Sequence, residues 1–151
     1  MLAIKTILHP TDFSERSAFA FRMACALARD YGAQLVVLHV AEPPRPIAFE
    51  GVAVPPPVVD MKQLRDRLQQ LRPEDPKVSV EHRLIEGDAP SEILRVAGET
   101  RCDVIVMGTH GRTGLGRLLM GSVAEQVVRK ASCPVLTVKT PEAAGGSAKA
   151  R

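Results

Sequence analysis

The feature that most constrains the fold is an alternation of short apolar runs with segments whose apolar residues repeat at helical spacing. The run at 34–40, Q-L-V-V-L-H-V, is almost continuously apolar, which is typical of a strand buried on both faces of a parallel sheet. The run at 103–107, D-V-I-V-M, has the same character. Parallel neighbours need a crossover connection, and helices supply it. The sequence therefore predicts an α/β fold.

Five strands and four helices follow from this pattern. Strands are predicted at 3–9, 34–40, 77–85, 103–107 and 134–138, and helices at about 20–31, 58–71, 88–98 and 120–131. Right-handed crossovers then give a doubly wound five-stranded parallel sheet with helices on both faces. Neither an internal repeat nor a second domain is indicated. We expect one domain over residues 1–139 and a flexible tail over 140–151.

Charge and composition exclude several function classes. The net charge is +3, of which the C-terminal end supplies +2, because Lys139, Lys149 and Arg151 outnumber Glu142. With one Tyr, no Trp and no run of Lys or Arg, the chain lacks the basic patch and stacking aromatics of a nucleic-acid binder. It also lacks a membrane-spanning run and the features of a secretory signal. We expect a cytoplasmic protein with no nucleic-acid or membrane partner.

The cysteines and a proline-rich segment are interpreted as structural features. Cys25, Cys102 and Cys133 are odd in number and widely spaced, which argues against a disulfide framework or a structural zinc site and favours small buried hydrophobes. The segment 42–57 contains six prolines, so it is predicted to be an irregular and mobile surface excursion.

Many of the candidate ligand-binding residues lie at 107–122, M-G-T-H-G-R-T-G-L-G-R-L-L-M-G-S, where five glycines follow a predicted strand. The dinucleotide fingerprint fails there, because Leu119 stands where the third glycine is needed after Gly114 and Gly116. The P-loop also fails, since Gly121 is followed by Ser122 and not by lysine. The usual NTPase interpretation is therefore excluded.

The remaining glycine pattern suits a phosphate group. Gly108 and Gly111 lack Cβ atoms, so the chain can turn sharply off the strand and bring its amides close to a ligand. Gly121 and Ser122 begin the last predicted helix, where unpaired amides and the positive end of the dipole favour anions. Arg112 and Arg117 can neutralise a polyphosphate, and a solvated loop arginine is the equally ordinary reading.

This pattern, Gly-x-x-Gly followed after nine residues by Gly-Ser, resembles the ATP-binding motif of the universal stress protein family. Four other segments resemble that family in the same order: P-T-D-F-S-E at 10–15, L-H-V at 38–40, G-D-A-P at 87–90 and S-C-P-V-L at 132–136. The likeness covers residues 1–139. It implies a sheet in the order 3-2-1-4-5, frequent dimerisation through the last strand, and adenine nucleotide binding.

The resemblance also implies a set of nucleotide-binding residues. These are Pro10, Thr11, Asp12, Val40, Met107, Gly108, His110, Gly111, Arg112, Gly121, Ser122 and Val123. We expect the ligand to be ATP with Mg²⁺ on its phosphates. Since no P-loop lysine or assured base is present, no catalytic residue is assigned and hydrolysis would be slow at most.

Two alternative functions and two alternative residue roles stay open at this stage. The chain can be an interaction module that engages an unidentified protein through its dimer surface and the segment from Pro43 to Pro57, with a cleft that is empty or purely structural. It can also be an enzyme of the related nucleotide α-hydrolase type, which would release pyrophosphate.

Asp12, with Glu15 three residues later, suits a helix N-cap as well as a ligand contact. His9, His39 and His110 lie near predicted strand ends, where a zinc site is the less favoured reading.

Overall fold

A computed structural model describes residues 1–109 and 120–141. Its main sheet has five parallel strands: β1 (Thr6–Pro10), β2 (Gln34–Ala41), β5 (Val80–Glu86), β6 (Val104–Gly108) and β7 (Val135–Val138). Their spatial order is β5-β2-β1-β6-β7. Counted along the main sheet alone, this is 3-2-1-4-5. The predicted fold class and strand order are confirmed.

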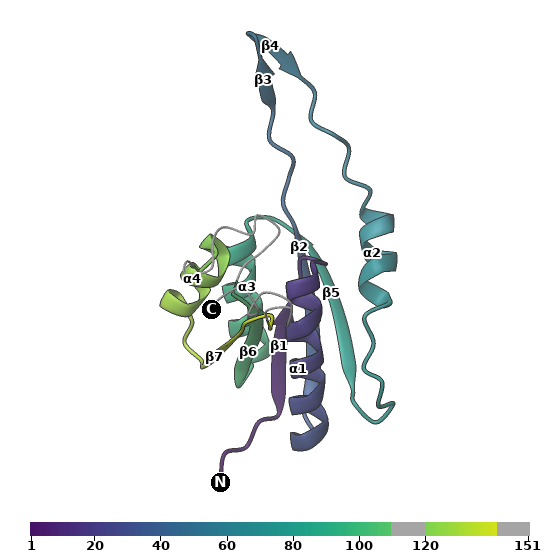
Figure 1. Ribbon diagram of the computed structural model, residues 1–151, viewed down its shortest axis with the longest axis vertical. Helices are drawn as coiled ribbons and strands as arrows, with labels where there is room; N and C mark the ends of the chain where they lie inside the picture. Colours follow the sequence, from purple (N-terminus) through teal and green to yellow (C-terminus); the bar gives the residue numbers. More distant parts are fainter. Residues whose placement is uncertain (110–119, 142–151) are drawn as a thin grey trace, which may run out of the picture.

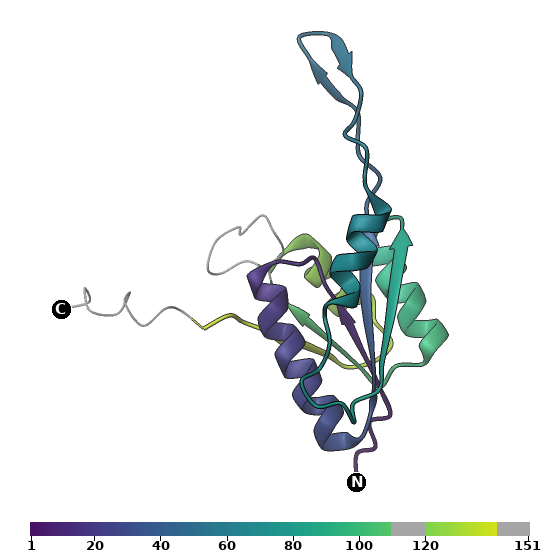
Figure 2. The ribbon, with the colours of Figure 1, turned by 90° about the vertical axis from the view of Figure 1, so that its right-hand side faces the viewer.

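Helices cover both faces of the sheet (Figures 1 and 2). They are α1 (Glu15–Tyr31), α2 (Met61–Gln69), α3 (Ala89–Thr100) and α4 (Ser122–Lys130). Helix α1 carries alanines at 20, 24 and 28, all buried, and this spacing of four residues places them on one face. Because alanine is small, α1 can pack closely against the strands.

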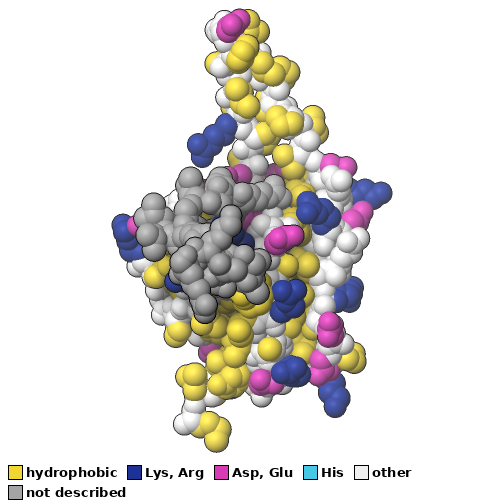
Figure 3. Space-filling model, in the orientation of Figure 1, with side chains coloured by type: hydrophobic (Ala, Val, Ile, Leu, Met, Phe, Trp, Pro, Cys, Tyr) yellow, Lys and Arg dark blue, Asp and Glu magenta, His cyan; other side chains and the backbone are white. Residues whose placement is uncertain are grey.

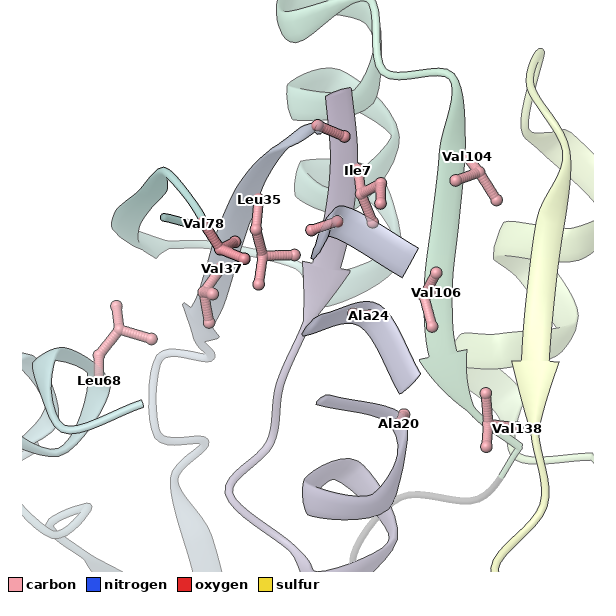
Figure 4. Close-up of a cluster of buried hydrophobic side chains, with 12 residues drawn as sticks. Ile7, Ala20, Ala24, Leu35, Val37, Leu68, Val78, Val104, Val106 and Val138 are labelled. Atoms are coloured by element: carbon pink, nitrogen blue, oxygen red, sulfur yellow. The ribbon is translucent and has the colours of Figure 1, made fainter. Parts of the chain in front are cut away.

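The core divides into two layers because successive strand residues point to opposite faces. Ile7, Leu35, Val37 and Val106 pack on the α1 side, where Leu68 anchors α2 (Figure 4). On the other side Leu8, Val36, Leu38 and Ile105 pack against α3 and α4 through Ile93, Val96 and Val127. Leu68 is 1% exposed, so its burial stabilises the position of α2 by about 2 kcal/mol.

The proline-rich segment is not wholly irregular, and the prediction for it was wrong in that respect. Residues Ile47–Phe49 (β3) and Val52–Val54 (β4) form an antiparallel hairpin that projects from the body (Figure 1). Its two-residue turn, Glu50 and Gly51, has φ values of 49° and 78°, as type I′ turns require. The prolines lie outside the six paired residues, so they do not interrupt the ladder.

Element ends also differ from the predictions. Helix α2 begins at Met61 because Asp60 accepts bonds from the amides of Lys62 and Gln63. Helix α4 begins at Ser122, with Gly121 as its N-cap. None of the helices in the described ranges is long and apolar enough to cross a membrane. The predicted tail lies outside the described residues from position 142 onward.

Candidate functional site

A cavity of about 510 Å³ lies where β1, β2 and β6 end at their carboxyl edge. Strand β1 lies between β2 and β6. From β1 the chain adds β2 and β5 on one side and then β6 and β7 on the other, so the strand order reverses at this point. Ligands of open α/β sheets bind at such a switch point. The volume falls in the range of small-molecule sites, roughly 300–1,000 Å³.

The structure brings together every predicted site residue that it describes. Nine of the predicted residues line the cavity: Pro10, Thr11, Asp12, Val40, Met107, Gly108, Gly121, Ser122 and Val123. The other three, His110, Gly111 and Arg112, lie outside the described residues. Residues more than 100 positions apart in the sequence therefore share one cavity.

The N-terminus of α4 differs from those of the other helices. Ser14, Asp60 and Asp88 cap α1, α2 and α3 by accepting bonds from first-turn amides. Gly121 caps α4 without a side-chain bond. The first-turn amides of α4 are thus not satisfied by a cap side chain, and they lie beside the cavity that Gly121, Ser122 and Val123 line. This arrangement favours an anion.

One hydrogen bond joins the two ends of the glycine-rich connection. The amide of Gly121 donates to the carbonyl oxygen of Thr109 at 2.7 Å. Thr109 directly follows β6, so the bond fixes the start of α4 against the end of that strand. Gly108 and the α4 terminus consequently form one wall of the cavity.

The end of β1 is held by a dense set of bonds around Thr11. The Thr11 amide donates to the Leu38 carbonyl at 2.8 Å, and its hydroxyl oxygen accepts from the Ser17 hydroxyl at 2.8 Å and the Phe13 amide at 3.1 Å. Phe13 has a φ of 63°, which is uncommon for a bulky residue and stores strain. The turn that presents Asp12 to the cavity is therefore strongly constrained.

The hypothesis that Asp12 is the N-cap of α1 was wrong, because the cap lies two residues later. Ser14 is the N-cap of α1, and Asp12 stabilises the preceding turn by accepting from the Ser14 amide at 3.0 Å. Asp12 also lines the cavity. Its carboxylate thus has a local structural role and a place in the candidate site.

Part of the cavity wall was not anticipated from the sequence. Val59 and Leu64 contribute from α2 and the segment before it, and Ala89 and Ile93 contribute from α3. Together with Val40 and Met107 they supply much of the apolar lining of the cavity. These residues looked like ordinary core positions in the sequence, and helical periodicity gives no sign of which core residues also border a cavity.

Among the described residues, His9 and His39 take part in backbone hydrogen bonds and belong to no cluster that could bind zinc. The Nδ1 of His9 donates to the Val106 carbonyl at 2.8 Å, and that of His39 donates to the Thr11 carbonyl at 2.7 Å. Their rings pack against Phe21 and Phe13 respectively. Within 1–109 and 120–141 no group of three His, Cys, Asp or Glu side chains could hold a metal ion. His110 lies outside those ranges.

Comparison with known proteins agrees with this architecture. The sequence profile of the Universal stress protein family matches residues 3–139. Universal stress protein MJ0531 of Methanocaldococcus jannaschii is 34% identical over 142 residues, covering 91% of this chain and 84% of that protein. MJ0577 of the same organism is 31% identical over 154 residues, covering 89% of this chain and 94% of that protein.

Solved structures give the same result. The structure of MJ0577 superposes with a TM-score of 0.76 at 25% identity, covering 94% of this chain and 100% of the other. A universal stress protein solved in complex with cAMP has a TM-score of 0.67 at 25% identity, covering 93% and 100%. The profile match, the relatives and the strand order together show that the chain belongs to the universal stress protein family.

Proposed function

We propose that this protein binds ATP in the cavity at the ends of β1, β2 and β6, and acts as a nucleotide-dependent module in a stress response. The observation that carries the proposal is the N-terminus of α4, which has no side-chain cap bond, beside a cavity lined by nine predicted residues. A relative's complex with cAMP supports an adenine nucleotide as the ligand class.

Different residues of the cavity would contact the phosphates, the adenine and the nucleoside of ATP. The main-chain amides of Ser122 and Val123 at the start of α4 would hold the phosphates, Gly108 and Gly121 would leave room for them, and Ser122 can add its hydroxyl. Val40 and Met107 would contact the adenine through their apolar side chains. Asp12 would accept from the nucleoside or approach a Mg²⁺ ion carried by the triphosphate. His110, Gly111 and Arg112 belong to the proposed phosphate site by sequence.

Binding suits these residues better than turnover. The glycine stretch has no P-loop lysine, and His39, the buried histidine that lines the cavity, uses its Nδ1 in a bond to the Thr11 carbonyl. Without a positioned base, any ATP hydrolysis is slow. We also propose a cytoplasmic homodimer formed through β7, an edge strand on which Leu136 is exposed.

The direct test is the nucleotide content of the purified protein. Protein prepared without added nucleotide is denatured, and the released small molecules are separated by chromatography; we expect ATP, or ADP and AMP derived from it. Calorimetric titration of the stripped protein with ATP and Mg²⁺ should then saturate at one site per chain. Absence of both co-purified nucleotide and saturable binding would exclude the proposal.

Replacing Asp12 by Asn separates its two roles. The Asn side-chain oxygen can still accept from the Ser14 amide, so the turn before α1 and the stability should be preserved. A lost charged contact to the nucleoside or to Mg²⁺ should weaken ATP binding by about tenfold. Calorimetry gives the affinity and urea denaturation gives the stability. Unchanged affinity would mean that Asp12 serves the turn alone.

A second candidate function is favoured by the projecting hairpin. Ile47, Phe49, Val52 and Val54 share one face, because Ile47 pairs with Val54 and Phe49 with Val52. All four are exposed, Phe49 by 69%, and hydrophobic side chains cover the projection in Figure 3. Such a face suits protein contact. The chain would then be a nucleotide-independent interaction module.

A pair of double variants tests this second candidate. If the hairpin joins copies of the chain, changing Phe49 and Val52 to Ser should weaken self-association of nucleotide-free protein by about tenfold in sedimentation measurements. The matched control changes Ala48 and Ala53, on the opposite hairpin face, to Ser and should have no effect. Equal association of both variants and the parent would rule out the hairpin as the contact and leave β7.

A further inference from the structure

We propose that Cys102 and Cys133 form a peroxide-reactive thiol pair that closes an intramolecular disulfide. Their sulfur atoms lie 3.7 Å apart, although the residues are 31 positions apart in the sequence. Both thiols are reduced in the structure. The sequence spacing argued against a disulfide framework, and the fold alone brings these two residues into contact.

The backbone on both sides of the pair is fixed. Cys102 donates its amide to the Ala97 carbonyl at 3.2 Å, just after the end of α3. Cys133 precedes Pro134, whose carbonyl accepts from the Ile105 amide at 3.0 Å where β6 and β7 begin to pair. The sulfurs must approach to about 2.05 Å. We expect rotation of the two side chains to supply this movement.

Burial assigns different roles to the two thiols. Cys102 is 6% exposed, and burial, followed by the neighbouring Cys133, raises the pKa of Cys102 to about 12. Cys133 is only partly buried. Peroxide therefore reaches Cys133 first, and Cys102 is the resolving thiol.

The chemistry balances with hydrogen peroxide as the oxidant. The Cys133 sulfur attacks one peroxide oxygen, an S–O bond forms, the O–O bond breaks, and the hydroxide released takes the thiol proton as water. The Cys102 sulfur then attacks the Cys133 sulfur, the S–S bond forms, and the sulfenic oxygen leaves with the Cys102 proton as a second water. The two thiols lose two electrons, and the peroxide gains them.

The disulfide would close a ring over residues 102–133, which contains β6 and α4. Closing a loop of this length restricts the unfolded chain. We expect the oxidised protein to melt about 10 °C higher than the reduced protein.

The test uses the full chain, reduced, then treated with hydrogen peroxide, denatured and alkylated. The parent should lose the mass of two hydrogens and accept one alkyl group, on Cys25, in place of three. Cys25 packs on the opposite face of the sheet, so Cys25→Ser is the matched control and should also lose two hydrogens. Cys102→Ala should instead gain oxygen on Cys133.

Peptide mapping makes the outcome decisive even if a variant folds poorly. A cross-linked peptide joining Cys102 to Cys133 in monomeric parent protein, with the rise in melting temperature, supports the proposal. Three alkylated cysteines after treatment, a disulfide that involves Cys25, or a linkage found only between chains on a non-reducing gel would overturn it. Loss of two hydrogens in Cys102→Ala would overturn it as well.

Discussion

Replacing Gly121 by Val should weaken ATP binding by at least about 100-fold while leaving the fold intact. Gly121 has φ −61° and ψ 154°, a conformation open to any L-residue, so valine creates no backbone strain. Its branched side chain would instead stand at the cavity wall, between the α4 amides and the phosphates. Loss of two charge-assisted bonds, each about 1.5–3 kcal/mol, accounts for the expected magnitude.

Calorimetric titration with ATP and Mg²⁺ measures this loss, and circular dichroism verifies the fold. Gly98→Ala is a suitable control, because Gly98 lies in α3 beyond the cavity-lining residues and an added Cβ there meets nothing within 4 Å. The control should bind ATP as the parent does. A Gly121→Val protein that is folded and binds with parental affinity would show that the phosphates lie elsewhere.

Acid should destabilise the protein by about 3 kcal/mol between pH 6.5 and pH 4 through His9 alone. His9 is fully buried, and its Nε2 is a buried atom without a hydrogen-bond partner in the described part of the chain. Burial lowers its pKa from 6.5 to about 4, against the smaller opposing effects of the Val106 bond and Asp12. The folded state therefore holds His9 neutral.

The direction of the effect follows from proton uptake. Between pH 6.5 and 4 the unfolded chain binds a proton at His9 and the folded chain does not, so stability is complete above pH 6.5 and falls as the pH drops. Asp103, whose pKa is lowered by the amides of Lys5 and Thr6, loses its contribution only below its ordinary value of 3.8. The two effects therefore occupy different pH windows.

Urea denaturation at a series of pH values measures the slope. His9→Asn retains a donor near the Val106 carbonyl and cannot titrate, so its stability should depend much less on pH in this window, whatever its absolute value. A variant that keeps the full acid loss would assign the effect to other groups.

Most of the architecture could be predicted from sequence because its causes are local. The apolar run of β2 indicated a strand buried on both faces, and Asp88 with Pro90 marked the start of α3. The glycine pattern around Gly108 and Gly121 indicated a phosphate site because a missing Cβ and a helix start are properties of a few adjacent residues. The family resemblance added the strand order, which the structure confirms.

The errors also have local causes. The prolines of the segment after β2 led to the prediction of an irregular excursion, although Glu50-Gly51 between alternating apolar residues is a hairpin signal. Asp12 and Ser14 are both good caps, and sequence alone did not distinguish which one begins α1. The structure assigns the N-cap to Ser14.

The sequence by itself determined the order of the main-sheet strands and the helices, and the family, since each depends on short-range pattern or motif; the same kind of pattern supplied the phosphate-site hypothesis. Only the tertiary structure decided that Leu64 and Ile93 border the cavity, that His9 is wholly buried, and that Cys102 touches Cys133. These facts depend on strand register and on how helices pack across the sheet. Such contacts join residues tens of positions apart, and no local pattern in the chain encodes them.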